Sequence, residues 1–248
     1  MSQDRSTLLP LLRKLERHGP LSAGDREAVL ALPHILKTLD AGSYIVRDGD
    51  EPEYCCVLLS GFAFRHKVVG NGGRQILSVH MTGDAVDLQQ VLLTTADHNV
   101  QALTRIDVAL VAGAVVAELA GTRPAVGRAM WTETLIEGSI HREWIANVGR
   151  RDSRTRLVHL LCELAIRQKA AGLSEGDQYL LPLTQEQLAD ATGLTPVHIN
   201  RVLQALRAEG IIATGKRQVT IRDWNSLAEV GDFSSRYLHL DQLNPQHA

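Results

Sequence analysis

The fold is most readily inferred from residues 183–210, which read LTQEQLADATGLTPVHINRVLQALRAEG. Gly193 and, three residues later, Pro196 interrupt a stretch that otherwise favours helix. Both residues destabilise a helix interior, by about 1 kcal/mol for glycine and about 3 kcal/mol for proline. Two short helices joined by a tight turn would use both residues. The spacing therefore predicts one helix that ends at Gly193 and a second that begins at Pro196.

The residues around these two positions agree with that interpretation. Thr184 and Gln187 have the spacing of a capping box at the start of the first helix. Gly193 falls where a helix often ends in a left-handed residue. Thr195 is a typical N-cap, and Pro196 then occupies the first helical position, where its missing N–H removes no hydrogen bond. The two helices form a helix-turn-helix.

The packing pattern and the following segment suggest a DNA-binding domain. Ala189, Gly193 and Ile199 have the spacing of a small residue, a turn glycine and a buried branched residue. The segment GIIATGKRQVTIRDW (210–224) reads as a hairpin, and it would add a wing with Lys216 and Arg217 at its tip. Helical hairpins without a DNA-binding function are common, so a protein that only binds other proteins is the alternative.

The segment upstream reads as a second, β-rich domain. From about residue 39 to residue 111, glycines bracket short apolar runs of strand length, and Gly70-Asn71-Gly72-Gly73 is a strong hairpin signal. This pattern predicts an antiparallel β-roll. Two short helices are expected in the first 40 residues, with Ser22 and Asp25 in capping-box positions, and another at 112–121.

A long helix is expected over 123–150, and its apolar residues cover more than one stripe. One side could pack on the roll and the other on a second copy of the chain, although an ordinary core helix would show the same pattern. The polar, basic stretch GRRDSRTR (149–156) marks a domain boundary. We expect a sensor domain at 1–121, a dimerisation helix and hinge at 122–150 and a winged helix-turn-helix at 151–248. The expected dimer contacts are Val126, Met130, Ile136, Ile140 and Trp144.

The composition describes an ordinary globular protein, with 44% hydrophobic and 22% charged residues in 248. Its longest apolar run is about half of what a membrane helix needs, and the N-terminus has no signal-peptide core. We therefore expect a cytoplasmic protein. The formal net charge of −2 means that any DNA contact must come from a local patch.

The whole chain resembles the Crp/Fnr family of bacterial transcription regulators. The resemblance runs from about Leu39 to Trp224 and rests on LDAGSYIVRDGDEPEYCCVLLSGFAFRHKVVGNGGRQILSVHMTGD, the long helical segment and the winged helix-turn-helix. It implies an α+β fold with a β-roll like that of cyclic-nucleotide-binding domains. It also implies a homodimer that binds a pseudo-palindrome in double-stranded DNA, and contacts to RNA polymerase if the protein is an activator.

The resemblance places the DNA contacts at the start of the second helix, at the start of the first helix and at the wing. An arginine at position 201 could form a bidentate pair with guanine, worth about 1–3 kcal/mol of discrimination. Many members have glutamate where this chain has Val197, so its half-site should differ from theirs. The expected DNA-binding residues are Thr184, Gln185, Thr195, Val197, His198, Asn200, Arg201, Lys216 and Arg217.

The sensor region departs from the cAMP-binding members. Between Asp84 and Thr104 there is no arginine, lysine or glutamate, although those members use glutamate and arginine for the ribose and the phosphate. We therefore expect no cAMP binding and name no cofactor or effector. A haem or a redox-active cysteine is the alternative, and the available groups are His66, His80, His98, His141, Cys55 and Cys56. Cys55 and Cys56 should point to opposite faces of one strand.

Other classes of site have little support. An N-terminal cysteine group of the iron–sulfur type is missing, because the first cysteine is residue 55. The chain has no zinc-type cysteine spacing, no His-x-His and no phosphate-binding glycine loop, so we predict neither a metal site nor an enzyme. The tail at 232–248 has no interpretation from its sequence.

Overall fold

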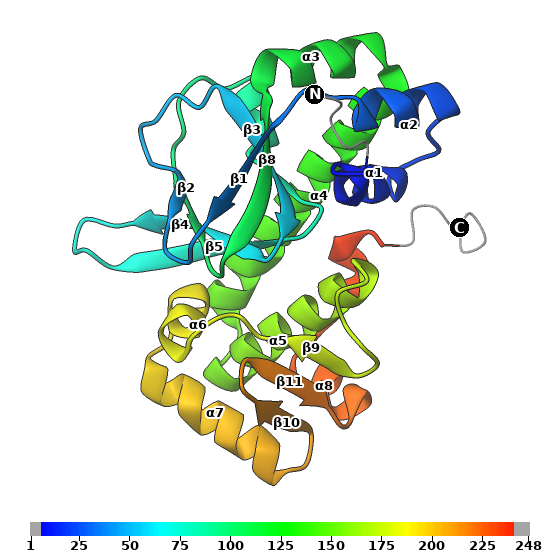
Figure 1. The fold of residues 1–248 in the computed structure, drawn as a ribbon. Helices are drawn as coiled ribbons and strands as arrows, with labels where there is room; N and C mark the ends of the chain where they lie inside the picture. Colours follow the sequence, from blue (N-terminus) through cyan, green and yellow to red (C-terminus); the bar gives the residue numbers. More distant parts are fainter. Residues whose placement is uncertain (1–5, 241–248) are drawn as a thin grey trace. The chain divides into compact units, whose positions relative to one another are not determined.

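The computed structural model describes residues 6–240, which form two compact units (Figure 1). The first unit comprises residues 6–67, 79–138 and 240, and the second comprises 68–78 and 139–239. The boundary between them falls inside the long helix α4 (Pro124–Arg150), whereas the boundaries expected at 121 and 150 coincide with the start and the end of that helix.

Two short helices begin the described chain, as predicted. They are α1 (Leu9–Glu16) and α2 (Ala23–Leu30). The capping box of α2 is present, because the Ser22 hydroxyl accepts from the backbone N–H of Asp25 while the Asp25 carboxylate accepts from that of Ser22. Leucines at helical spacing in and beside α1 are fully or almost fully buried.

The β-roll consists of two four-stranded antiparallel sheets, in the strand orders β1-β8-β3-β6 and β2-β7-β4-β5. The hairpin predicted at Gly70-Asn71-Gly72-Gly73 joins β4 to β5, and Gly72 has a φ of 81°. The short 3-10 helix η1 (Leu88–Val91) follows β6. The strands are β1 (Ile35–Leu39), β2 (Tyr44–Val46), β3 (Tyr54–Ser60), β4 (Phe62–Val68), β5 (Arg74–Met81), β6 (Ala85–Val86), β7 (Asn99–Ala102) and β8 (Ile106–Ala112).

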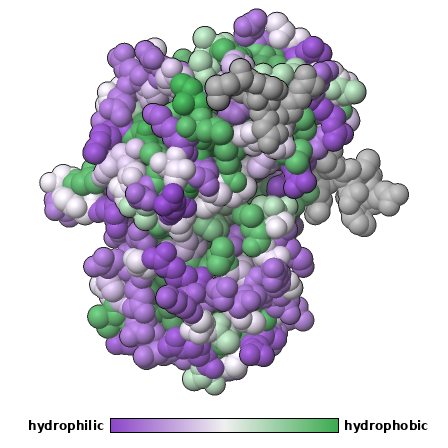
Figure 2. Space-filling model, viewed as in Figure 1, coloured by the Kyte–Doolittle hydropathy of each residue, from purple (hydrophilic) through white to green (hydrophobic). Residues whose placement is uncertain are grey.

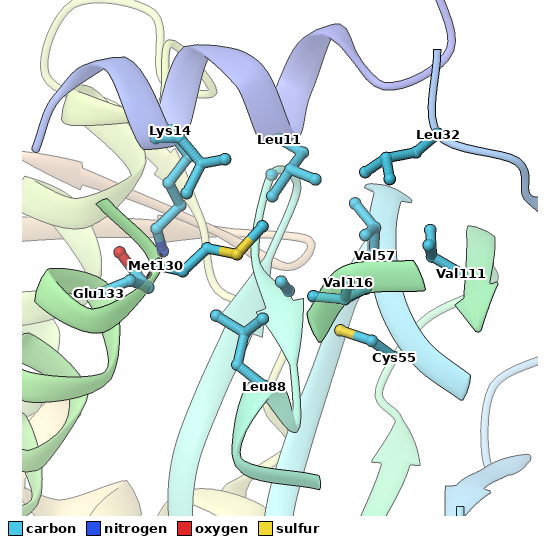
Figure 3. A pocket seen from close by; sticks show the side chains of 13 residues that line it. Leu11, Lys14, Leu32, Cys55, Val57, Leu88, Val111, Val116, Met130 and Glu133 are labelled. Atoms are coloured by element: carbon cyan, nitrogen blue, oxygen red, sulfur yellow. Dashed lines mark ion pairs between the residues drawn. The ribbon is translucent and has the colours of Figure 1, made fainter. Parts of the chain in front are cut away.

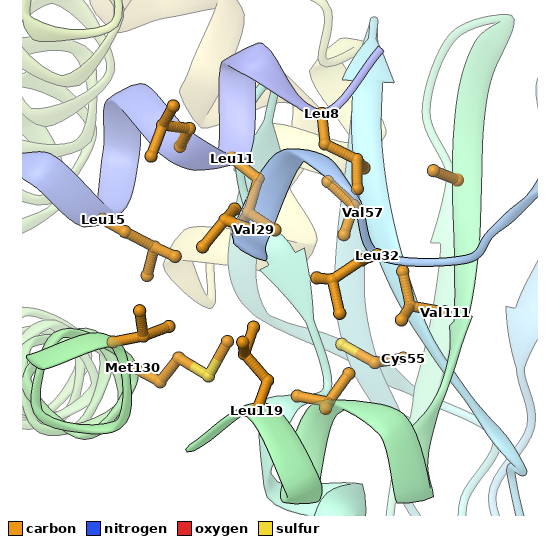
Figure 4. Packing of buried hydrophobic residues seen from close by; sticks show 14 of the residues in the cluster. Leu8, Leu11, Leu15, Val29, Leu32, Cys55, Val57, Val111, Leu119 and Met130 are labelled. Carbon is orange, nitrogen blue, oxygen red and sulfur yellow. The ribbon is translucent and has the colours of Figure 1, made fainter. Parts of the chain in front are cut away.

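Strand β3 has a hydrophobic core on each face. Cys55 and Val57 face the cluster that α1, α2, α3 (Gly113–Thr122) and the start of α4 complete (Figure 4). Cys56 and Leu58 face the cluster inside the roll. The prediction that adjacent cysteines point to opposite faces is confirmed, and the two thiols therefore lie in separate cores.

The second unit contains the predicted helix-turn-helix and wing. The helices are α5 (Ser153–Ala170), α6 (Gln185–Thr192), α7 (Pro196–Ala208), α8 (Trp224–Val230) and the 3-10 helix η2 (Ser235–Leu238). The wing strands β10 (Ile212–Gly215) and β11 (Gln218–Ile221) pair with a third strand, β9 (Gln178–Leu180), in the order β10-β11-β9.

β9 is not predicted by the sequence pattern. Its outer edge is held at Gln178 by backbone bonds to Glu175. At Leu180 it is held by the Gln168 amide, which donates to the Leu180 carbonyl (2.7 Å) and accepts from the Leu180 N–H (3.0 Å). A three-residue strand is too short to show a clear alternation of apolar and polar residues in the sequence.

The segment after the wing, which had no interpretation from its sequence, packs on α5. Glu163 is fully buried, and its Oε2 accepts from the Trp144 indole and from the Tyr237 hydroxyl, both at 2.9 Å. The Tyr237 ring stacks on His159, and Phe233 packs edge-on against the same imidazole. Residues 231–239 thus complete the core of the second unit, while 241–248 lie outside the described residues.

Within residues 6–240, no helix has both the length and the apolar character required to span a bilayer.

Two glycines in left-handed conformations give a matched test of the roll. At Gly61 (φ 78°) an added Cβ would lie 2.5 Å from the Arg105 carbonyl oxygen, whereas at Gly49 (φ 90°) it would meet nothing within 4 Å. We expect Gly49→Ala to lower the free energy of unfolding by about 1 kcal/mol, the cost of the backbone conformation alone. Gly61→Ala should lower it by about 3 kcal/mol or more, because the backbone must also shift.

Denaturant unfolding followed by circular dichroism measures both variants. Equal effects of the two substitutions would contradict the close approach of Gly61 to Arg105.

Candidate nucleic-acid interface

The start of α7 is fixed by three local features that the sequence predicted. Gly193 ends α6 in the left-handed conformation (φ 65°, ψ 33°). Thr195 is the N-cap of α7, and its hydroxyl accepts from the His198 N–H, while Pro196 is the first helical residue. At α6, Thr184 and Gln187 form the complete capping box. The turn between the helices is therefore specified by residues 193–196 themselves.

Buried side chains hold α7 against α6. Ala189 and Ile199 lie in the core, as their spacing predicted, and so do Leu188, Val202, Leu203 and Leu206. Thr192 is also fully buried, and its hydroxyl donates to the Leu188 carbonyl at 2.7 Å. With this face of α7 buried, the opposite face is presented to solvent.

All nine residues expected to contact DNA are exposed. Val197 is 67% exposed, and Arg201, one turn further along α7, makes no ion pair within residues 6–240. His198 already has one hydrogen-bonding partner in the chain, because its Nδ1 lies 2.9 Å from the Thr195 hydroxyl. On the side shown in Figure 2, the surface around α6, α7 and the wing is mainly hydrophilic.

The wing presents its two basic residues at a tight turn. Lys216 and Arg217 connect β10 to β11, and Arg217 has a φ of 56°, so the turn uses a left-handed residue without glycine. The Arg207 guanidinium donates to the Thr214 hydroxyl at 2.9 Å and ties the wing to α7. Arg207 and Gln204 were not among the residues expected to contact DNA, although Gln204 is exposed and shares a helix face with Val197 and Arg201.

The residues expected to form the dimer contacts are buried within a single chain. Val126, Met130, Ile136, Ile140 and Trp144 are each at most 8% exposed within a single chain. Val126 and Met130 pack in the cluster beneath α1 and α2, and the Trp144 indole donates to Glu163. Within a single chain, these five side chains are therefore almost fully covered. The periodicity did not distinguish the inward-facing stripe of α4 from the outward-facing one.

The exposed apolar residues of α4 form a different stripe. Trp131, Leu135 and Ile145 are 69%, 59% and 73% exposed. With Gly138 and Arg142, they follow one another at intervals of four, three, four and three residues, which is the heptad spacing of a coiled-coil seam.

The interior of the first unit holds a cation that the sequence between Asp84 and Thr104 does not contain. Arg65 of β4 is buried, and its guanidinium donates to Asp87 Oδ1 (2.8 Å) and to Glu137 Oε1 (2.5 Å). The segment from Asp84 to Thr104 therefore does lie against an arginine, which comes from another strand. That arginine is already paired with two carboxylates of the chain itself.

A small cavity lies beneath α1 in the same unit (Figure 3). Its volume is about 10 Å³, which is room for about one water molecule. Its walls are apolar except at one end, where the Lys14 ammonium pairs with Glu133 at 2.6 Å and also with Asp84. This cavity is too small to hold a nucleotide.

The three thiols are buried and hard to ionise. Burial raises the pKa of Cys55 to about 12, with a further contribution from Asp87, and burial also raises the pKa of Cys162 to about 12. The pKa of Cys56 is raised in the same direction by burial and by its neighbour Cys55. Because the thiolate is the reactive form, these positions do not favour a redox role.

The fold and the exposed face of α7 define a winged-helix DNA-binding protein with an N-terminal β-roll. Residues 36–123 match the cyclic nucleotide-binding domain, and residues 155–230 match the Crp-like helix-turn-helix domain. The chain is 30% identical over 226 residues to the transcriptional activator protein FnrL of Cereibacter sphaeroides, covering 88% of this chain and 90% of FnrL.

A second relative and a solved structure are also similar to this chain. The chain is 27% identical to the nitrogen fixation regulation protein FixK of Azorhizobium caulinodans, covering 75% of this chain and 74% of FixK. The structure of FixK2 from Bradyrhizobium japonicum superimposes with a TM-score of 0.74 at 23% identity, over 82% of this chain and all of that one. The chain belongs to the Crp/Fnr family of transcription regulators.

The buried thiols lead to a direct test of the redox alternative. We expect Cys55, Cys56 and Cys162 to react with an aromatic disulfide reagent at pH 8 only as the protein unfolds, because burial both shields the thiols and raises their pKa values. Labelling is followed at increasing urea concentration. Rapid labelling of one thiol in the native protein would contradict this expectation and support a redox site.

Proposed function

We propose that the protein is a homodimeric regulator that binds a pseudo-palindromic DNA sequence, with half-sites about one helical turn apart. The observation that carries this proposal is the start of α7, where the caps of Gly193 and Thr195 fix the helix and leave Arg201 exposed and without an ion pair in the described residues. Because its target is DNA, we expect the protein to act in the cytoplasm.

Base recognition is assigned to the exposed face of α7. An arginine can bond the O6 and N7 atoms of guanine together, so Arg201 would specify a G·C pair. The exposed side chain of Val197 offers only apolar contact, for instance to a thymine methyl group. Thr195, His198 and Asn200 would add contacts to bases or phosphates. Thr184, Gln185, Lys216 and Arg217 would contact the backbone and set the register.

The dimer is assigned to the exposed stripe of α4. Trp131, Leu135 and Ile145 are large apolar side chains in water, and their heptad spacing fits a second copy of the same helix. Gly138, between them, would let the two backbones approach closely. Two copies of α7 related by a two-fold axis would then explain a palindromic site.

Control by cAMP is not part of the proposal. A buried cyclic phosphate needs a cation that can pair with it. The guanidinium of Arg65 is already paired with Asp87 and Glu137. The relatives that the chain matches are transcription regulators, and we propose that this chain has no enzymatic activity either. If the protein is an activator, RNA polymerase is a further partner.

Selection of random duplex DNA by the purified protein tests the function. We expect a palindrome to be enriched by the wild type without any added ligand. Arg201→Ala should lose about 5- to 150-fold in affinity for that site, because one bidentate contact to guanine contributes about 1–3 kcal/mol. Its melting temperature should not change, since the side chain is exposed.

Arg105→Ala is the matched control, because Arg105 is an exposed arginine of the β-roll. It should bind the selected site like the wild type. Full sequence specificity in a folded Arg201→Ala variant would overturn the assignment of this residue. Enrichment of no specific sequence, even with cell extract added, would favour the alternative of a protein that has lost DNA binding.

The dimer surface has its own test. Leu135→Glu should convert a dimer into a monomer in analytical ultracentrifugation, because a carboxylate in an apolar seam is strongly unfavourable. Leu36→Glu on β1 is the control, since Leu36 and Leu135 are almost equally exposed, at 58% and 59%. A Leu135→Glu variant that stays dimeric would place the interface on another surface.

A further inference from the structure

His98, just before β7, is held by a carboxylate at each ring nitrogen. Its Nε2 lies 2.8 Å from Asp87 Oδ1, and its Nδ1 lies 2.7 Å from Asp97 Oδ1. The side chains of His98 and Asp87 are almost fully buried, whereas that of Asp97 is 84% exposed. We call this group of three residues the His98 clasp.

The clasp requires a charged imidazole. The pKa values of Asp87 and Asp97 are both lowered. Burial alone would raise that of Asp87, but the bonds from His98 and Arg65 outweigh it, while for Asp97 the bond from His98 is the main cause. Ionised carboxylates only accept hydrogen bonds, and a neutral imidazole has only one N–H. Both bonds can therefore exist together only when His98 carries two ring protons.

The clasp is connected to α4 through a second shared group. Asp87 Oδ1 also accepts from Arg65, whose other terminal nitrogen donates to Glu137 on α4. Asp87 itself has a left-handed backbone (φ 63°, ψ 40°), an unfavourable conformation that its three donors, His98, Arg65 and Gln89, maintain. The protonation state of His98 therefore acts directly on the carboxylate that orients Arg65.

Other charged groups surround this path within the first unit. The two ring nitrogens of His80 on β5 lie 3.9 Å from Glu137 Oε1 and 3.7 Å from Asp84 Oδ2. Lys14 on α1 pairs with Asp84 and with Glu133 on α4, and His18 lies 2.5 Å from Glu133. The charge of Lys67, at the end of β4, contributes to lowering the pKa of Asp97. Of these neighbours, only the Asp87 and Asp97 carboxylates contact the His98 ring nitrogens.

We propose that the His98 clasp is a proton switch, and that protons are an effector of this regulator. The claim that protons are an effector rests on the DNA-binding function proposed above. When His98 loses its proton, its remaining N–H stays on the buried Asp87, because the exposed Asp97 is readily hydrated instead. The bond to Asp87 then loses the charge of its donor, the Asp97 carboxylate turns to solvent, and Arg65 has to neutralise Asp87 and Glu137 without the imidazolium.

The direction of the pH dependence follows from the contacts of His98. Burial alone lowers the pKa of His98, but the bonds to Asp87 and Asp97 outweigh it and raise the pKa above its ordinary value of 6.5. A raised pKa in the folded state stabilises the protein fully below the unfolded value. This stabilisation is lost as the pH rises through the folded value. The closed clasp is thus the low-pH form.

Proton NMR of the histidine C2–H signals in the full-length protein tests the clasp directly. The His98 signal is assigned by its absence in His98→Gln. We expect its titration midpoint to lie above 6.5, and we expect Asp97→Asn to move the midpoint down, since one of the two ionised acceptors is removed. A wild-type midpoint at or below 6.5, or no effect of Asp97→Asn, would overturn the proposal.

The melting temperature and the affinity for the selected DNA site, measured from pH 6 to pH 8.5, test the switch. We expect both to fall for the wild type, the affinity by about tenfold, as for the loss of one charge-assisted hydrogen bond. His98→Gln should remove this part of the pH dependence. His34→Gln, a histidine bonded to the Leu32 carbonyl in the same unit, should keep it. Any effect of His198 in the DNA interface is common to all three proteins.

The two proposals can fail separately. If no DNA site is selected at any pH, the proposed function fails, while the NMR titration and the melting temperatures still decide on the clasp. If DNA is bound but its affinity changes with pH equally in the wild type and in His98→Gln, protons are not an effector acting through this residue.

Discussion

The turn at residues 193–196 is the constraint on which the DNA-reading surface depends. The left-handed Gly193 ends one helix, and the Thr195 cap begins the next within two residues, so the direction of α7 is determined by backbone geometry. The buried face of α7, with Ile199 and Leu206, then fixes its rotation about its own axis. Once direction and rotation are set, the exposed positions of Val197 and Arg201 follow from the helical repeat.

This part of the fold was predictable because its signals are local. Caps, a turn glycine and a helix-initiating proline act over three or four residues, and each appeared where expected. The same holds for the Gly70–Gly73 hairpin and for the opposite faces of Cys55 and Cys56. The wing turn at Lys216 and Arg217 was also found, although its left-handed residue is an arginine and not a glycine.

Two of the features that the sequence did not predict depend on pairs of residues far apart in the chain. Arg65 reaches Asp87 across 22 positions, so a search between residues 84 and 104 could not find it. The Tyr237 hydroxyl donates to Glu163, 74 positions away, so the sequence does not show that the segment after the wing packs on α5. The apolar residues of α4 lie on more than one stripe, so the sequence gives no indication of which stripe packs against its own chain. The five residues expected at the dimer interface are buried within a single chain.

The amide of Gln168 has a consequence for the behaviour of the protein in a crowded solution. β9 is the outermost strand of the C-terminal sheet, and an open outer strand is a template on which another chain can add a strand and start aggregation. The Gln168 amide bonds both backbone groups of Leu180, as a neighbouring strand would. Together with the Glu175 backbone, which bonds to Gln178 beside it, this side chain closes that edge to unwanted β-pairing.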